Sequence, residues 1–119
     1  MMKTDEAIKA FSQSEKLKSA LIWASQLADV HLALPEVDKP GAERIIKTLV
    51  GMIGNEISVA QKAAPHDSWL AAEKDINTAM VMLNSGVAHE SGYHLTQALS
   101  KVTSIGQQSM TQLIDEGLL

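Results

Sequence analysis

The chain has 119 residues, no cysteine and a formal net charge of −4 at pH 7. Its length fits one domain, and 45% hydrophobic with 20% charged residues is typical of a globular protein. The lack of cysteine excludes disulfides, thiolate metal sites and cysteine nucleophiles. The lysines are scattered among acids and Arg44 is the single arginine, which argues against nucleic-acid binding. We therefore predict a single domain over residues 1–119 with no nucleic-acid partner.

The start of the chain gives no sign of export. Asp5 and Glu6 lie where a secretory signal would be basic, and no apolar run of signal length follows. No stretch reaches the roughly 18 uninterrupted apolar residues that a membrane span requires. We therefore expect a cytoplasmic protein with no membrane partner.

The first segment of the chain carries two apolar patterns that are out of phase. From Leu17 to Leu34 apolar residues recur every three or four positions, which predicts a helix. Extended backward at 100° per residue, the same helix carries Ile8 and Phe11 on the opposite face, beside Ile22. The helix therefore either breaks between Phe11 and Leu17 or has two apolar faces.

Two start signals favour the break. Ser12–Glu15 has the spacing of a capping box, and Thr4 followed by two acids can cap a short opening helix. We predict a short N-terminal helical arm, residues 1–11, as a possible docking element.

Two further helices follow. Gly41–Ala64 has one broad apolar stripe, formed by Ala42, Ile45, Ile46, Leu49, Val50, Ile53, Ile57, Ala60 and Ala64. A third helix is capped by Asp67 or Ser68 and ends before Gly86, which can take the left-handed conformation.

The fourth helix is predicted over Ser91–Glu116. Gly106 lies on its apolar stripe, and we interpret it as a packing notch where a neighbouring helix approaches. All the connections are short, and short connections make neighbouring helices antiparallel. The predicted fold is all-α, an antiparallel up-down-up-down four-helix bundle with the short N-terminal arm.

Three histidines are candidates for ligand chemistry: His31, His89 and His94. His31 lies on the apolar stripe, where a partly buried imidazole with an acid or carbonyl partner is expected. His89 and His94 flank a Glu as in zinc proteases, but five residues apart they diverge by about 140° on a helix. We therefore predict no metal site and no cofactor.

The segment Ala88-His89-Glu90-Ser91-Gly92 and the size of the bundle resemble histidine phosphotransfer domains. Such domains expose one His on a helix, followed closely by Lys and Gly. This chain departs from the pattern, because Glu90 would repel a phosphoryl group and no Lys follows His89. The resemblance implies a phosphoacceptor as an alternative function. The histidines themselves add small-ligand or metal binding, so the alternative is a His-centred domain using His31, His89 or His94.

The positive signal for function is surplus apolar surface. Ile8, Phe11, Ile22 and Trp23 lie off the main stripe of the first helix, and Phe and Trp are typical interface anchors. No acid, base and nucleophile converge in the sequence, so we assign no catalytic residue. We expect a non-enzymatic protein–protein interaction or regulatory module that self-associates as a homo-oligomer, possibly a dimer.

Overall fold

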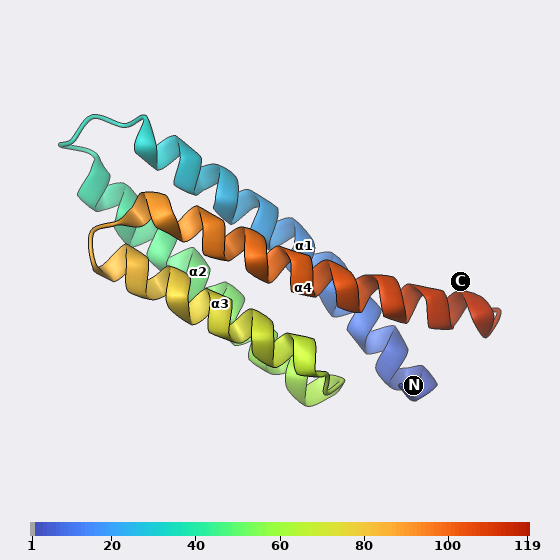
Figure 1. The fold of residues 1–119 in the computed structure, drawn as a ribbon. Helices are drawn as coiled ribbons and strands as arrows, with labels where there is room; N and C mark the ends of the chain where they lie inside the picture. The colour runs from blue at the N-terminus through green and yellow to red at the C-terminus, as the bar shows by residue number, and fades with distance from the viewer. Residues whose placement is uncertain (1) are drawn as a thin grey trace.

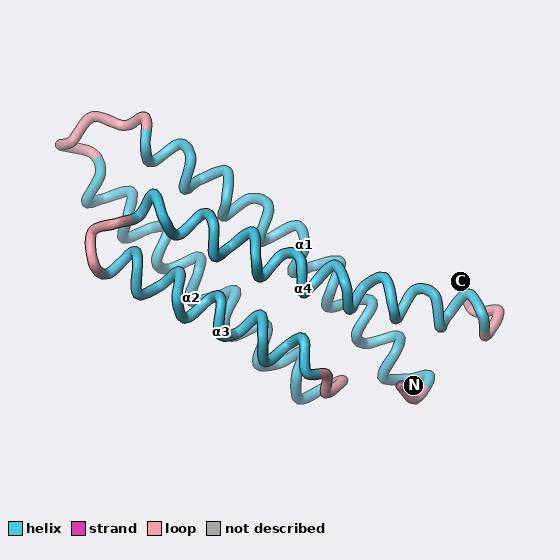
Figure 2. Tube along the Cα trace, in the orientation of Figure 1, coloured by secondary structure: helices cyan, strands magenta, loops and turns pink. Residues whose placement is uncertain are grey.

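The computed structural model describes residues 2–119, and within them the chain forms four α-helices and no strand (Figure 1). The helices are α1 (Thr4–Leu32), α2 (Lys39–Ala63), α3 (Asp67–Asn84) and α4 (Ala88–Asp115). Short loops join them at the ends of the rods (Figure 2). The all-helical prediction is confirmed. No helix among residues 2–119 is long and apolar enough to cross a membrane.

The buried side chains follow a heptad pattern in every helix, with alternating steps of three and four residues. We call this row of each helix its core seam. In α1 and α2 it comprises Ala7, Ala10, Ser14, Leu17, Leu21, Ala24, Ala28 and His31, and then Ile46, Val50, Ile53, Ile57 and Ala60. In α3 and α4 it comprises Trp69, Ala72, Ile76, Ala79 and Leu83, and then Ala88, Ser91, Leu95, Ala98, Val102, Ile105, Ser109 and Gln112. This spacing is that of coiled-coil packing, in which side chains of one helix fit between those of the next.

The helices pack as expected for a bundle. α1 contacts α2 and α4, and α3 contacts the same two helices, with α1 and α4 in the most extensive contact. The molecule is elongated, with extents of 54 × 20 × 17 Å, and both ends of the chain lie at the same end of it (Figure 1). Each helix thus has an inner side toward the core and an outer side toward solvent.

α1 is one continuous helix, so the predicted break and the separate N-terminal arm over residues 1–11 are wrong. The Ser14 hydroxyl donates to the Phe11 carbonyl oxygen within the helix, and no second start occurs at Ser12–Glu15. The core seam continues through Ala7 and Ala10, which are buried against the bundle. The other possibility raised by the sequence is therefore the correct one: α1 is a single helix that carries apolar residues on more than one face.

The start of α1 is tied to the end of α4. Lys3, rather than Thr4, is the N-cap residue of α1. The Thr4 hydroxyl instead donates to Glu116 Oε1 at 3.1 Å, and Gln112 Nε2 donates to the Met2 carbonyl oxygen. These contacts bring the two ends of the chain together.

The cap of α3 and the start of α4 differ from those predicted. α3 is capped by His66, whose Nδ1 accepts from the Ser68 N–H at 3.0 Å, and Nε2 of the same ring lies 2.9 Å from Gln108 Oε1 on α4. α4 begins at Ala88 rather than Ser91, which places His89 in its first turn. Gly86 has a φ of 78°, the left-handed conformation predicted for it.

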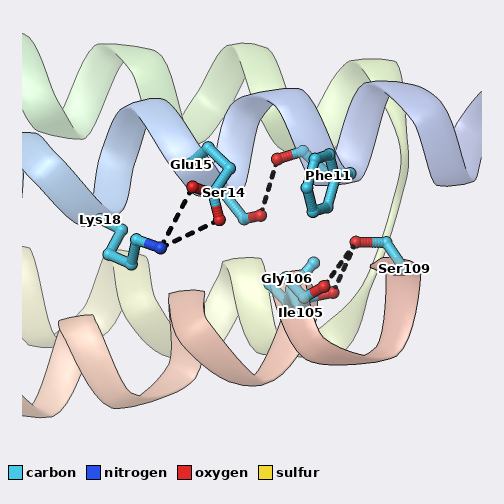
Figure 3. Close-up of polar contacts among 7 residues, drawn as sticks. All are labelled: Phe11, Ser14, Glu15, Lys18, Ile105, Gly106 and Ser109. Atoms are coloured by element: carbon cyan, nitrogen blue, oxygen red, sulfur yellow. Dashed lines mark hydrogen bonds and ion pairs between the residues drawn. The ribbon is translucent and has the colours of Figure 1, made fainter. Parts of the chain in front are cut away.

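α1 and α4 approach one another closely at Gly106 (Figure 3). A Cβ atom at this position would lie 2.7 Å from Ser14 Oγ and 3.3 Å from Ser14 Cβ. The neighbouring Ser109 hydroxyl bonds back to the carbonyl oxygens of Ile105 and Gly106 and so needs no partner on α1. The interpretation of Gly106 as a packing notch is confirmed.

Candidate functional surface

α1 and α2 each carry a second row of residues, spaced by fours and threes like the core seam but lying outside it. We call these rows the outer seams. They comprise Lys16, Ala20, Trp23, Leu27 and Val30 on α1, and Ile45, Leu49, Met52, Glu56 and Val59 on α2. All of these residues are apolar except Lys16 and Glu56. The outer seams therefore have the composition of a packing surface. Ala20 and Leu49 are partly buried against the core, and the larger side chains of the rows are exposed.

The two outer seams lie side by side. Lys16 Nζ is 3.1 Å from Glu56 Oε2, which joins the rows at one end. A surface groove between the helices is lined by Lys16 and Ala20 from α1 and by Leu49 and Met52 from α2. The rows thus form one surface, which we call the outer face.

Trp23 and Val30 extend this surface along α1. They lie one and two heptads beyond Lys16, and residues seven apart project from nearly the same side of a helix. On α2, Ile45 lies one heptad before Met52 and lines a shallow hollow with it. The outer face therefore runs along much of both helices.

The large side chains of the outer face are strongly exposed. Ile45 is 69%, Trp23 63%, Met52 59% and Val30 55% accessible to solvent. Single exposed apolar residues are common on protein surfaces, whereas several grouped on one face are typical of interaction surfaces. Ile45, placed by the sequence in the core stripe of its helix, is instead one of the most exposed large apolar residues among those the structure describes.

The opposite side of the bundle has a different chemistry. The corresponding outer row of α4 is polar and comprises Glu90, His94, Gln97, Lys101, Ser104 and Gln108. Through polar pairs it contacts α3 and the residue that caps it: Lys101 pairs with Asp75, and Gln108 with His66. Large apolar side chains are also exposed on α3 and α4, at Leu70, Val81, Tyr93 and Ile114, but the row of α4 that corresponds to the outer seams is polar.

Of the four partner-binding residues predicted from the sequence, the structure places Trp23 on the outer face. Phe11 is half-buried and lines a hollow with Gly106 and Met110 of α4. Ile8 and Ile22 are 51% and 39% exposed, and their helical positions lie on the same side of α1 as Phe11. The structure thus separates Trp23 from the other three.

His31 and His89 are brought together, and His94 is not. His31 and His89 line one hollow with Glu36 and Glu43, at the end of the bundle that holds the α1–α2 loop. His94 lies outside this hollow, with its ring in edge-to-face contact with Tyr93 at a centroid distance of 5.2 Å. The candidate histidines therefore do not form one three-membered cluster.

His31 has the acid partner that its position on the stripe predicts. It is 5% exposed, and its Nε2 lies 3.2 Å from Glu43 Oε1. This contact has the distance of an ion pair but not the geometry of a hydrogen bond, and Nδ1 has no hydrogen-bond partner. Over residues 2–119 no group of three or more His, Cys, Asp or Glu is arranged to hold a metal ion.

No known protein family, curated protein or solved structure matches this chain.

Proposed function

We propose that this chain is a non-enzymatic, cytoplasmic protein–protein interaction module that docks a partner on the outer face of α1 and α2. Its scaffold in this proposal is an up-down-up-down four-helix bundle, with no catalytic residue, cofactor or metal. The observation that carries the proposal is the strong exposure of Trp23 on α1 and of Ile45 and Met52 on α2, two helices that share an apolar surface groove.

The area of exposed apolar surface that a partner would cover favours reversible docking. The exposed parts of the large side chains amount to roughly 500 Å², a figure near the upper end for the largest apolar patch of a monomer. Buried area does not convert directly into affinity, because association costs about 4–15 kcal/mol and also orders the contacting side chains, and we expect a moderate net affinity. The outer face therefore suits an exchangeable partner.

The test uses the tagged full chain expressed in its own cells together with an untagged copy. The bound proteins, the untagged copy included, are identified by mass spectrometry for the native sequence, for I45E/M52E and for V81E. Val81 is a matched control, because it is 57% exposed on α3 while Met52 is 59% exposed on the outer face.

We expect the native chain and V81E to retain the same set of proteins and I45E/M52E to lose it. Retention of that set by I45E/M52E would show that binding uses another surface. Recovery of the native chain with nothing bound would also contradict the proposal.

A second candidate, the His-centred domain, is favoured by one observation: His31 and His89 share a hollow, and Nδ1 of His31 lacks a partner. His89 is exposed in the first turn of α4, where the helix N-terminus favours anions. Incubation with phosphoramidate and titration with Zn²⁺, each repeated with H31Q and H89Q, test this candidate. Phosphorylation or stoichiometric binding that either variant abolishes would support it, and no reaction with either reagent would remove it.

A further inference from the structure

Resting on the proposed function, we infer that the partner on the outer face is a second copy of this chain. The two copies are related by a two-fold axis, so that α1 and α2 of each lie against α1 and α2 of the other. These four helices then form a second bundle, which buries Trp23, Ile45 and Met52 at its centre.

The spacing of the outer seams is the first argument. Their steps of four and three match those of the core seams. The polar row of α4 has the same steps, so the outer seams are distinguished by having both this spacing and apolar side chains. A row with this spacing fits between the side chains of another row that has it. A second copy supplies two such rows side by side, and a two-fold axis brings the same surface of each copy together.

The charges of the outer face are the second argument. Lys16 and Glu56 neutralise one another within each copy. The positions that border Trp23 and Met52 at steps of four and three carry the uncharged residues Ser19, Gln26, Thr48 and Asn55. Arg44 lines the hollow with Ile45 and Met52, and its long side chain can carry the guanidinium to solvent at the edge of a contact. The centre of the outer face is otherwise uncharged, so two copies can meet there without opposing like charges.

The available area is the third argument. Each copy contributes roughly 500 Å² of exposed apolar surface, so a symmetric contact covers about 1,000 Å² of it. The polar border adds to this total and brings the contact near the lower limit of specific interfaces, about 1,200 Å². A dimer of this size is expected to exchange with monomer at micromolar concentrations.

Sedimentation equilibrium of the full chain between about 1 and 100 µM tests the inference, because this range spans moderate affinities. The native chain is expected to move from 12.8 kDa toward twice that mass as concentration rises. I45E/M52E is expected to remain monomeric, with a dissociation constant raised about 100-fold or more, since burying unpaired charges is costly. V81E is expected to behave like the native chain.

Each other outcome overturns the inference. A native chain that is monomeric throughout excludes the dimer, while the co-purification experiment still decides independently whether the outer face binds other proteins. A dimer that persists in I45E/M52E excludes this face as its interface. If circular dichroism shows that I45E/M52E has lost helix, I45S/M52S replaces it and is expected to be monomeric. A dimeric I45S/M52S again excludes the face.

Discussion

At position 106 of α4 a hydrogen atom occupies the only space available for a side chain. Gly106→Ala would place a methyl group 2.7 Å from Ser14 Oγ, whose hydroxyl is held 2.8 Å from the Phe11 carbonyl oxygen. We expect a net loss of about 1 kcal/mol in unfolding free energy, because overpacking by about 1–3 kcal/mol outweighs the helix propensity gained. Urea denaturation measures it.

Gly51→Ala is the matched control, because no atom lies within 4 Å of the added Cβ at this mid-helix position on α2. This variant is expected to gain about 0.5–1 kcal/mol from helix propensity alone. Adding Ser14→Ala to Gly106→Ala removes the closest atom and should restore part of the loss. Equal stabilisation by the two Gly→Ala changes would contradict the notch.

His66 stabilises the first turn of α3 through a ring nitrogen. His66→Ala removes the acceptor for the Ser68 N–H and should lower the unfolding free energy by about 1 kcal/mol, as for other N-caps. His66→Asn retains an acceptor at the cap and should recover most of this loss. Thermal and urea unfolding of both variants measure the effect, and equal losses would mean that the ring acts otherwise than as a cap.

Residue-scale prediction from sequence succeeded where local spacing was sufficient. Gly106 on an apolar stripe and His31 near a helix end both had the roles expected from their positions. The cap at His66 was missed because Asp67 and Ser68 are commoner cap residues. The ring of His66 also contacts Gln108, which is 42 positions away in the sequence. No local pattern reveals such a contact.

At the scale of elements, the continuity of α1 makes a prediction about proline. Ser12→Pro lies inside the helix, where the ring removes an N–H and clashes with the preceding turn, so a loss of about 3 kcal/mol is expected. Thr4→Pro is the control, because it is the first helical residue and Lys3 before it is extended, with φ −64° and ψ 155°.

Chemical denaturation followed by circular dichroism compares the two proline variants. Thr4→Pro should cost little beyond the exposed hydrogen bond to Glu116. If Ser12→Pro were equally well tolerated, α1 would have to start anew near Ser12, and the two-helix interpretation would be restored.

The prediction of a break in α1 was wrong for a physical reason. The continuing core seam of α1 consists of Ala7, Ala10 and Ser14, small residues that carry little hydrophobic signal. They are buried because α4 approaches closely there, with Gly106 opposite Ser14. Ile8 and Phe11 are larger and dominated the apolar pattern, although Ile8 is exposed and Phe11 only half-buried. Small residues at a close helix contact thus hid the true phase of the helix.

At the scale of the whole molecule, composition and periodicity predicted four helices in one bundle, but the outer face emerged only from their arrangement. On α2 the core seam and the outer seam are adjacent rows, and together they form a single broad stripe in the sequence. Ile45 and Ile46 show the consequence, because they are neighbours in the chain yet are 69% and 4% exposed. Which row faces the core depends on where α1 and α3 lie, and that is a property of the assembled bundle.

The fluorescence of Trp23, measured as the protein is diluted, tests most directly whether a second copy covers the outer face. Trp69 is fully buried in the core and supplies a constant background, while Trp23 is 63% exposed in a single copy. On dilution from about 100 µM to about 1 µM, the emission of the native chain and of V81E should shift to longer wavelength as the dimer dissociates. I45E/M52E should show the long-wavelength emission throughout. A native chain whose Trp23 is equally exposed, and equally quenched by acrylamide, at every concentration would contradict the account.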